Sequence, residues 1–341
     1  MLAALPLMVG CGSGQGVREH IHIVGSSTVY PFSTVVAEQF GQKTPFPTPL
    51  IESTGSGGGI KLFCAGLGFQ HPDVVNSSRR IKASEVAACE RHAVDDIVEV
   101  NIGYDGIVMG LSRANPPPAL TRAHIFLALA KQVPDGDGLI DNPHRFWSDI
   151  DPALPNWEIQ VFGPPPTSGT RDAFVELAME DGCKHSAGWI AALAHTDERR
   201  FRVLCHAMRE DGHFVEAGEN DNLIVKKLNA NPQALGIFGF SSLDQNLDQV
   251  QAAPVDGVTP TFANIANRSY PVSRPLYFYV KKRHVRLVPG LREFLAEFTG
   301  EDASGEFGYL SYRGLIPLAD GHRRDVAQRA ADLTPLRLPE S

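Results

Sequence analysis

The chain has 341 residues, of which 43% are hydrophobic and 21% charged, and its formal net charge is −8. This length and composition suit two globular domains, each with its own hydrophobic core. A mildly acidic chain without a long basic run is a poor candidate for nucleic-acid binding. No apolar run approaches the roughly 18 residues that a membrane-spanning helix needs. A polytopic transporter and a collagen-like or coiled-coil fibre are therefore excluded, and we expect no nucleic-acid partner.

Residues 1–19 have the composition of a targeting segment followed by a linker. Residues 1–9 are apolar, and Gly10, Cys11 and a Gly/Ser/Gln run follow them. This order resembles a bacterial lipobox, which implies cleavage before Cys11 and lipid attachment to its thiol. Because no basic residue precedes the apolar stretch, an ordinary signal peptide or an incidental cysteine stays an alternative. Export predicts a protein of the periplasm or cell surface that touches the membrane only through its lipid anchor.

The four cysteines other than Cys11 agree with export, because disulfides persist in oxidising compartments. Four cysteines allow three pairings, and the simplest joins Cys64 to Cys89 and Cys183 to Cys205. The alternative is four buried free thiols. No Cys or His spacing suggests a zinc site.

Strand-like and helix-like patterns alternate along the rest of the chain. Strands are expected at residues 21–24, 159–162, 235–240 and 275–282, and two apolar segments lie around Gly103. Helices are expected up to residue 40, at 84–91 and 121–131, up to residue 178, and at 291–298 and 322–331. Residues 134–143 form a turn-rich loop. This alternation is typical of an α/β architecture.

Three loops share one pattern, in which Gly, Ser and Thr follow a strand and precede a helix. They are GSSTVYP at residues 25–31, TGSGGGIK at 54–61 and PPTSGTRDAF at 165–174. Helix N-termini carry unpaired N–H groups and the positive end of the helix dipole, and hydroxyl groups add further donors. The alternative is that these residues only cap helices. Three such ends together predict a site for an oxyanion.

Sequence motifs of common enzymes are missing from the chain. The pattern around Ser56 has Thr54 where a nucleophile elbow needs glycine, and no GxxxxGK[ST] or strand-linked GxGxxG occurs. The histidines are scattered and have no metal-ligand spacing. We therefore expect a protein that is not an enzyme and needs no cofactor or metal.

The segments GSSTVYP, GSGGGIK, SGTRDAF and NPQALGIFGF together resemble the substrate-binding protein of the bacterial ABC phosphate transporter, the PstS family. The resemblance implies a two-lobed, type II-like periplasmic-binding-protein fold. In this fold each lobe is a central sheet flanked by helices, and the ligand lies in the cleft between lobes. It also implies capture of inorganic phosphate and its delivery to the permease subunits of an ABC transporter.

The resemblance also suggests lobe boundaries and ligand-binding residues. One lobe is expected at residues 20–110 plus 272–341 and the other at 111–271, with hinge crossings near 110–118 and 268–275. By motif position, the implied phosphate-binding residues are Ser27, Thr28, Val29, Ser56, Ser78, Ser168, Gly169 and Thr170.

Two positions depart from the family pattern. Ser78 stands where the family often has an Asp that accepts the proton of phosphate, and Pro164 stands where it often has an Arg. Arg171 is the first candidate for the missing charge and Arg79 the second, while Asp221 could replace the proton acceptor. These departures leave open a binder of sulfate or another tetrahedral oxyanion. A secreted phosphate-ester hydrolase on the same fold is the alternative from another class.

Overall fold

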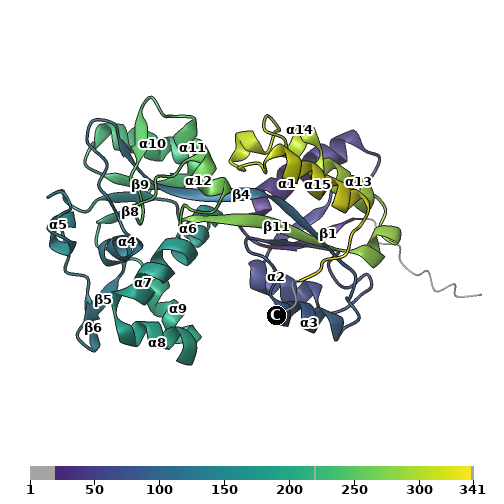
Figure 1. Ribbon diagram of the computed structural model, residues 1–341, viewed down its shortest axis with the longest axis horizontal. Helices are drawn as coiled ribbons and strands as arrows, with labels where there is room; N and C mark the ends of the chain where they lie inside the picture. Colours follow the sequence, from purple (N-terminus) through teal and green to yellow (C-terminus); the bar gives the residue numbers. More distant parts are fainter. Residues whose placement is uncertain (1–19, 219, 339–341) are drawn as a thin grey trace, which may run out of the picture.

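The computed structural model describes residues 20–218 and 220–338 of the chain. The expected lipidation site Cys11 lies outside the described residues. The molecule has two lobes, which long strands connect in the middle (Figure 1). Within the described residues, no helix combines the length and the apolar character that crossing a bilayer requires.

The first lobe contains both ends of the described chain. Its elements are β1 (His22–Gly25), α1 (Tyr30–Lys43), β2 (Leu50–Ser53), α2 (Ser56–Phe63), β3 (Val74–Ser77), α3 (Ala83–Glu90), η2 (Lys282–Arg286), α13 (Leu291–Thr299), α14 (Glu301–Ser304), η3 (Ser311–Arg313) and α15 (Asp320–Ala331). Helices α1, α13 and α15 lie on one side of its strands, and α2 and α3 lie on the other (Figure 1). This lobe therefore has three layers.

The second lobe is formed by the middle of the chain. Its elements are α4 (Arg122–Leu129), β5 (Gln132–Asp135), β6 (Gly138–Asp141), α5 (Trp147–Ile150), β7 (Val161–Gly163), α6 (Gly169–Phe174), η1 (Val175–Met179), α7 (Glu180–Ser186), α8 (Gly188–Thr196), α9 (Glu198–His206), β8 (Phe214–Glu216), α10 (Asp221–Ala230), β9 (Leu235–Gly239), α11 (Phe240–Asp244), β10 (Val250–Ala252) and α12 (Phe262–Ala266). Its disulfide and its helices α7 to α9 form a separate helical corner (Figure 1).

Two strands join the lobes, β4 (Ile97–Ser112) and β11 (Ser273–Lys281). The strands follow the order β2-β1-β3-β11-β4-β9-β7-β8, and β10 also pairs with β4. Residues 97–106 of β4 pair with β11, whereas residues 107–112 pair with β9 and β10 in the second lobe. The chain therefore passes between lobes inside one continuous strand, with β11 beside it.

The two apolar segments around Gly103 belong to one strand, β4, which runs through this position. The pairing of β4 with β11 shifts register there, so that Leu276 faces Gly103 and Tyr277 faces Asn101. Gly103 has a φ of 146°, which favours glycine. A glycine inside a strand marks a bulge of this kind rather than the end of the strand.

The turn-rich loop at residues 134–143 differs from the expectation. Its flanks pair as the antiparallel hairpin of β5 and β6, with Asp135 opposite Gly138. Gly136 supplies a φ of 57° in the two-residue turn between them. Short turns with positive φ suit the twist of a hairpin, which explains why turn-forming residues here sit between two strands.

The hydrophobic core is divided in the same way as the lobes. In the first lobe, one cluster contains Phe40 and Phe294 and another contains Phe63 and Tyr279. The second lobe has its own cluster, which includes Ile107 and Val272. The core cluster changes between Ile102 and Ile107 and again between Val272 and Leu276. The expected lobe boundaries at residues 110 and 272 stay a prediction.

Both cysteine pairs form the local disulfides that we expected. Cys64 bonds to Cys89 between the end of α2 and α3, and Cys183 bonds to Cys205 between α7 and α9. Each bond stays within one lobe, so neither restrains the movement of one lobe against the other.

Candidate anion-binding site

The first glycine-rich loop connects β1 to α1 where the two lobes meet. Gly25 has a φ of 129°, and a Cβ atom there would lie 2.1 Å from the carbonyl oxygen of Asn76. Only glycine fits this approach, which turns the chain sharply into the helix. Within the described part of the chain, the backbone N–H groups of Thr28 and Val29 have no hydrogen-bond acceptor. The Val29 side chain is buried in the core beneath them.

The third loop, at the start of α6, lies directly against the first. The Ser27 hydroxyl donates to Asp172 Oδ2 at 2.6 Å, and the Thr28 hydroxyl donates to the carbonyl oxygen of Gly169 at 3.3 Å. Ser168 caps α6 by accepting a hydrogen bond from the N–H of Thr170 at 3.2 Å. The structure therefore brings the donor groups of the two loops together, although 145 residues separate Ser27 from Asp172.

A cavity of about 780 Å³ lies beside these two loops, between the lobes. Five of the predicted residues and the candidate acceptor line it, namely Ser27, Thr28, Ser168, Gly169, Thr170 and Asp221. Its other polar lining residues include Ser53, Ser241 and Arg313.

The second loop takes a different position from the other two. The Ser56 hydroxyl oxygen accepts a hydrogen bond from the N–H of Ser78 at 3.1 Å, and the two hydroxyl groups lie 3.0 Å apart. Neither residue lines the cavity, which only Ser53 reaches from this part of the chain. Ser56 and Ser78 thus satisfy each other within the first lobe.

The structure does not bring Arg171 or Arg79 to the cavity. The Arg171 guanidinium lies 4.5 Å from the ring centre of Phe214 and donates to the carbonyl oxygen of Pro164 at 3.1 Å. Arg79 makes two hydrogen bonds to Glu85, at 2.9 and 2.7 Å, which raise the pKa of Arg79. Each guanidinium is held by groups of its own lobe, and the role of either arginine as the countercharge stays a prediction.

Three acidic residues line the cavity, Glu38, Asp105 and Asp221, and the sequence analysis identified only Asp221. Asp221 Oδ2 accepts hydrogen bonds from the Ser242 hydroxyl at 2.7 Å and the Gly239 N–H at 3.3 Å. Burial raises the pKa of Asp221, and it also raises the pKa of Asp105 on β4. The negative charge of Asp221 further raises the pKa of Asp105. These groups can accept a proton from a ligand, or donate one when protonated.

Another residue that the sequence reasoning missed is Arg274, on β11. It is 5% exposed and lies opposite Asp105 in the sheet, with a distance of 4.0 Å between its Nε and Asp105 Oδ2. Its Nη2 donates to the Thr28 hydroxyl oxygen at 2.5 Å. Arg274 directly precedes the apolar run PLYFYV of this strand, and a charged residue next to such a run is the signal that could have identified it.

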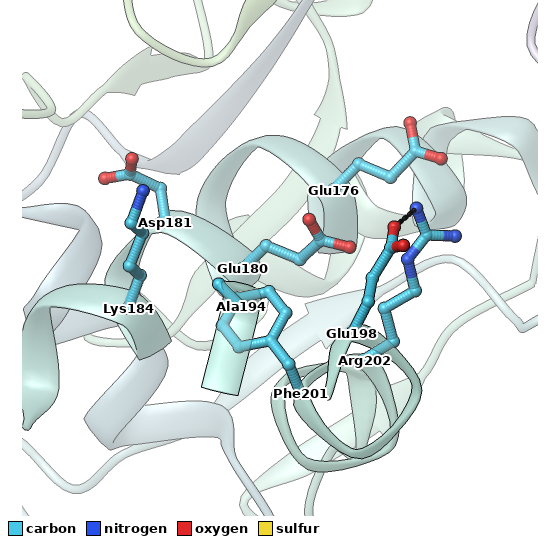
Figure 2. Close-up of a pocket in the computed structure, with 8 residues that line it drawn as sticks. All are labelled: Glu176, Glu180, Asp181, Lys184, Ala194, Glu198, Phe201 and Arg202. Atoms are coloured by element: carbon cyan, nitrogen blue, oxygen red, sulfur yellow. Dashed lines mark hydrogen bonds and ion pairs between the residues drawn. The ribbon is translucent and has the colours of Figure 1, made fainter. Parts of the chain in front are cut away.

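Another cavity, of about 320 Å³, lies in the helical corner of the second lobe (Figure 2). Acidic side chains outnumber basic ones around it, and the lining is Glu176, Glu180, Asp181, Lys184, Ala194, Glu198, Phe201 and Arg202. Arg202 is already paired with Glu198 at 2.8 Å. This charge distribution does not favour an anion. Within residues 20–218 and 220–338, no group of three or more His, Cys, Asp or Glu side chains is arranged to hold a metal ion.

Comparisons with known proteins agree with this architecture. A family model described as a PBP superfamily domain matches residues 12–302. Protein SphX of Synechococcus elongatus is 28% identical over 77% of this chain and 69% of its own length. The phosphate-binding protein PstS of Staphylococcus saprophyticus is 27% identical over 88% of this chain and 83% of its own length.

A solved structure shares the arrangement of both lobes. It is a possible phosphate binding protein from Planctomyces limnophilus, with a TM-score of 0.74 and 27% sequence identity, and the match covers 94% of this chain and 100% of that one. The two-lobed α/β fold that the sequence resemblance implied is confirmed. Since the family model covers most of its length, the chain belongs to the PBP superfamily.

Proposed function

We propose that this protein binds inorganic phosphate between its two lobes and delivers it to the permease of an ABC transporter. The observation that supports this best is the meeting of the loops at residues 25–31 and 165–174 across the lobe boundary. Ser27, Thr28, Ser168 and Thr170 of the two loops line one cavity, and the N–H group of Thr28 has no acceptor among the residues that the structure describes. Such donors replace the water shell of an oxyanion, and the helix ends add a favourable potential. The relatives named for phosphate binding support the same ligand.

The carboxyl groups of the cavity favour phosphate over sulfate. At neutral pH phosphate carries a proton that it can donate, whereas sulfate has none. Asp221 and Asp105 both line the cavity and can accept that proton. Sulfate would place its oxygen atoms against a carboxylate without a hydrogen between them, which is unfavourable in a buried site. We infer that Asp221 takes the role of the Asp that the family pattern has at the position of Ser78.

Calorimetric titration with phosphate and with sulfate tests this proposal directly. We expect saturable binding of phosphate at one site per chain and binding of sulfate at least about a hundredfold weaker, since an unmatched polar contact in a buried site gives discrimination of this order. Equal affinity for the two ions would contradict the proposed ligand. The absence of phosphate binding would contradict the proposed function as a whole.

We also propose that the protein is exported and held at the membrane by a lipid on Cys11, with no catalytic role of its own. The two disulfides support an oxidising compartment. Cys11→Ser should move the protein from the membrane fraction to the soluble fraction of the producing cells. An unchanged distribution would contradict the anchor and leave phosphate binding unaffected.

An assay with a chromogenic phosphate ester should find no hydrolysis above the rate without protein.

A further inference from the structure

Arg274 is a buried cation placed at the junction of the two lobes. Its side chain is 6% exposed, and β11, on which it lies, is one of the two strands that join the lobes. Within the part of the chain that the structure describes, its Nε has no hydrogen-bond partner. A buried guanidinium with an unsatisfied donor is unfavourable unless other groups balance its charge.

The two outer nitrogen atoms of Arg274 hold groups from different lobes. Nη2 donates to the hydroxyl oxygen of Thr28 in the first lobe, and Nη1 donates to Glu176 Oε2 in the second lobe at 2.6 Å. Thr28 is buried, whereas the Glu176 side chain is 54% exposed. Glu176 also lines the open acidic cavity of the helical corner, together with Glu180 (Figure 2). Its carboxylate is therefore the partner of Arg274 that can move into solvent.

We propose that Arg274 supplies the positive charge of the anion site, and that the Glu176 carboxylate is an internal anion which bound phosphate displaces from it. This inference rests on the proposed function. An anion that replaces the Gly169 carbonyl oxygen as the acceptor of the Thr28 hydroxyl would lie next to the Arg274 guanidinium, which donates to the same hydroxyl oxygen. Glu176 would then be a like charge close to the ligand in a poorly solvated place, and the two would repel each other.

Three other arginines are less suited than Arg274 to supply the positive charge of the anion site. Arg79 is engaged by both oxygen atoms of Glu85, and Arg171 lies over the ring of Phe214. Arg313 lines the cavity, but it is exposed, so water screens its charge more than that of the buried Arg274. Arg274 is the one that contacts a predicted ligand-binding residue, and charge-assisted hydrogen bonds are about twice as strong as neutral ones.

The displacement makes the affinity depend on Glu176. In the free protein, the Glu176 carboxylate is paired with the Arg274 guanidinium. Only molecules in which this pair is broken can bind phosphate, so the apparent affinity is the intrinsic affinity multiplied by their fraction. Glu176→Gln removes the negative charge but keeps the size of the side chain. Because the ion pair is half exposed, we expect phosphate to bind about two- to fivefold tighter to Glu176→Gln, the range for a partly solvated pair.

The sign of this change separates displacement from a merely structural role. If Glu176 only held the lobes or Arg274 in place, its substitution would weaken phosphate binding. Calorimetry with phosphate should compare wild type, Glu176→Gln and the control Glu198→Gln. Glu198 is an acidic residue of the same helical corner that pairs with Arg202 instead. The control should bind phosphate with wild-type affinity.

A double substitution tests whether the effect passes through Arg274. Arg274→Gln should bind phosphate roughly ten- to a hundredfold more weakly, as expected for the loss of a charged hydrogen-bond donor. Adding Glu176→Gln to it should then give no further gain. If Arg274→Gln does not fold, the direction in which Glu176→Gln changes the phosphate affinity still tests the displacement.

The results of these titrations distinguish a failure of the displacement from a failure of the proposed function. Wild type that binds phosphate, together with equal or weaker binding by Glu176→Gln, overturns the displacement and leaves the proposed function standing. A gain in affinity that persists in the Arg274→Gln background also overturns it. Wild type without phosphate binding overturns both.

Discussion

The two glycine-rich loops of the first lobe have similar sequences but different surroundings. The loop at residues 25–31 contacts the start of α6 in the other lobe, through Ser27 and Thr28. The loop at residues 54–61 stays within its own lobe, where Ser56 pairs with Ser78. A Gly/Ser/Thr loop before a helix therefore predicts hydrogen-bond donors. Which of these donors can bind a ligand between the lobes depends on their contacts with the opposite lobe.

Among the substitutions considered, one at Gly169 should disturb the contact between the two lobes most. A Cβ atom there would lie 2.8 Å from Thr28 Cα and 2.9 Å from the carbonyl oxygen of Ser27. Gly169→Ala should push the two loops apart and weaken phosphate binding roughly a hundredfold, at the upper end of the effects of overpacking. Calorimetry measures the affinity.

Gly188→Ala is the matched control, since Gly188 is also the first residue of its helix, α8, and a Cβ atom there meets nothing within 4 Å. It should leave the affinity unchanged. Wild-type affinity in Gly169→Ala would mean that the two loops do not need to touch for binding.

Thr28 and Ser56 test the comparison between the loops directly. Thr28→Val removes a donor at the cavity and leaves the Nη2 of Arg274 without its partner, so phosphate binding should weaken roughly ten- to a hundredfold. Ser56→Ala should change the affinity less than about threefold, and should lower the free energy of unfolding by about 1 kcal/mol through the lost hydrogen bond to Ser78. Equal losses of affinity in both variants would place the second loop in the site as well.

Asp221 should set the choice between phosphate and sulfate. Asp221→Asn removes the acceptor of the ligand's proton, so the preference for phosphate over sulfate should fall roughly tenfold, the worth of one hydrogen bond to a charged group. Competition titrations measure this ratio. Asp244→Asn, on the exposed end of α11, is the control and should keep the wild-type preference.

The same variant should change how stability depends on pH. Because burial raises the pKa of Asp221, the folded protein keeps this proton to a higher pH than the unfolded chain. The stabilisation is complete below the unfolded pKa, near 4, and is lost as the pH rises through the raised folded pKa. Urea unfolding should therefore show a larger fall in stability with rising pH for wild type than for Asp221→Asn. Parallel pH curves would contradict this assignment.

Arg171 should have the smallest effect on affinity. Its guanidinium lies over Phe214 and outside the cavity, so Arg171→Ala should change phosphate affinity less than about threefold and lower stability by about 1 kcal/mol through the lost cation–π contact. Calorimetry and urea unfolding measure the two quantities. A loss of binding by tenfold or more would return to Arg171 the role that its place in the motif suggested.

Local patterns predicted much of the fold and part of the site. The strand, the Gly/Ser/Thr loop and the helix that follows are neighbours in the sequence, so the donors around Thr28 and Gly169 could be found from it. The local disulfides could be found for the same reason.

Arg274 and Asp105 could not be placed in this way. Their neighbours are set by the pairing of β11 with β4, which brings together residues far apart in the chain. The position of Arg171 depends on Phe214, which is likewise distant in the sequence and holds the guanidinium away from the cavity. Such contacts between distant segments decide which of several similar charged residues can serve a ligand.

Locating a bound ion in a crystal tests the proposed anion site most directly. Arsenate has the shape and the protons of phosphate, and its arsenic atom can be found in a crystal by anomalous diffraction. We expect one strong arsenic peak between Thr28 and the start of α6, in contact with groups of both lobes. An arsenic peak elsewhere, such as in the acidic cavity of the helical corner (Figure 2), would contradict the site, as would a complex that occupies only one lobe.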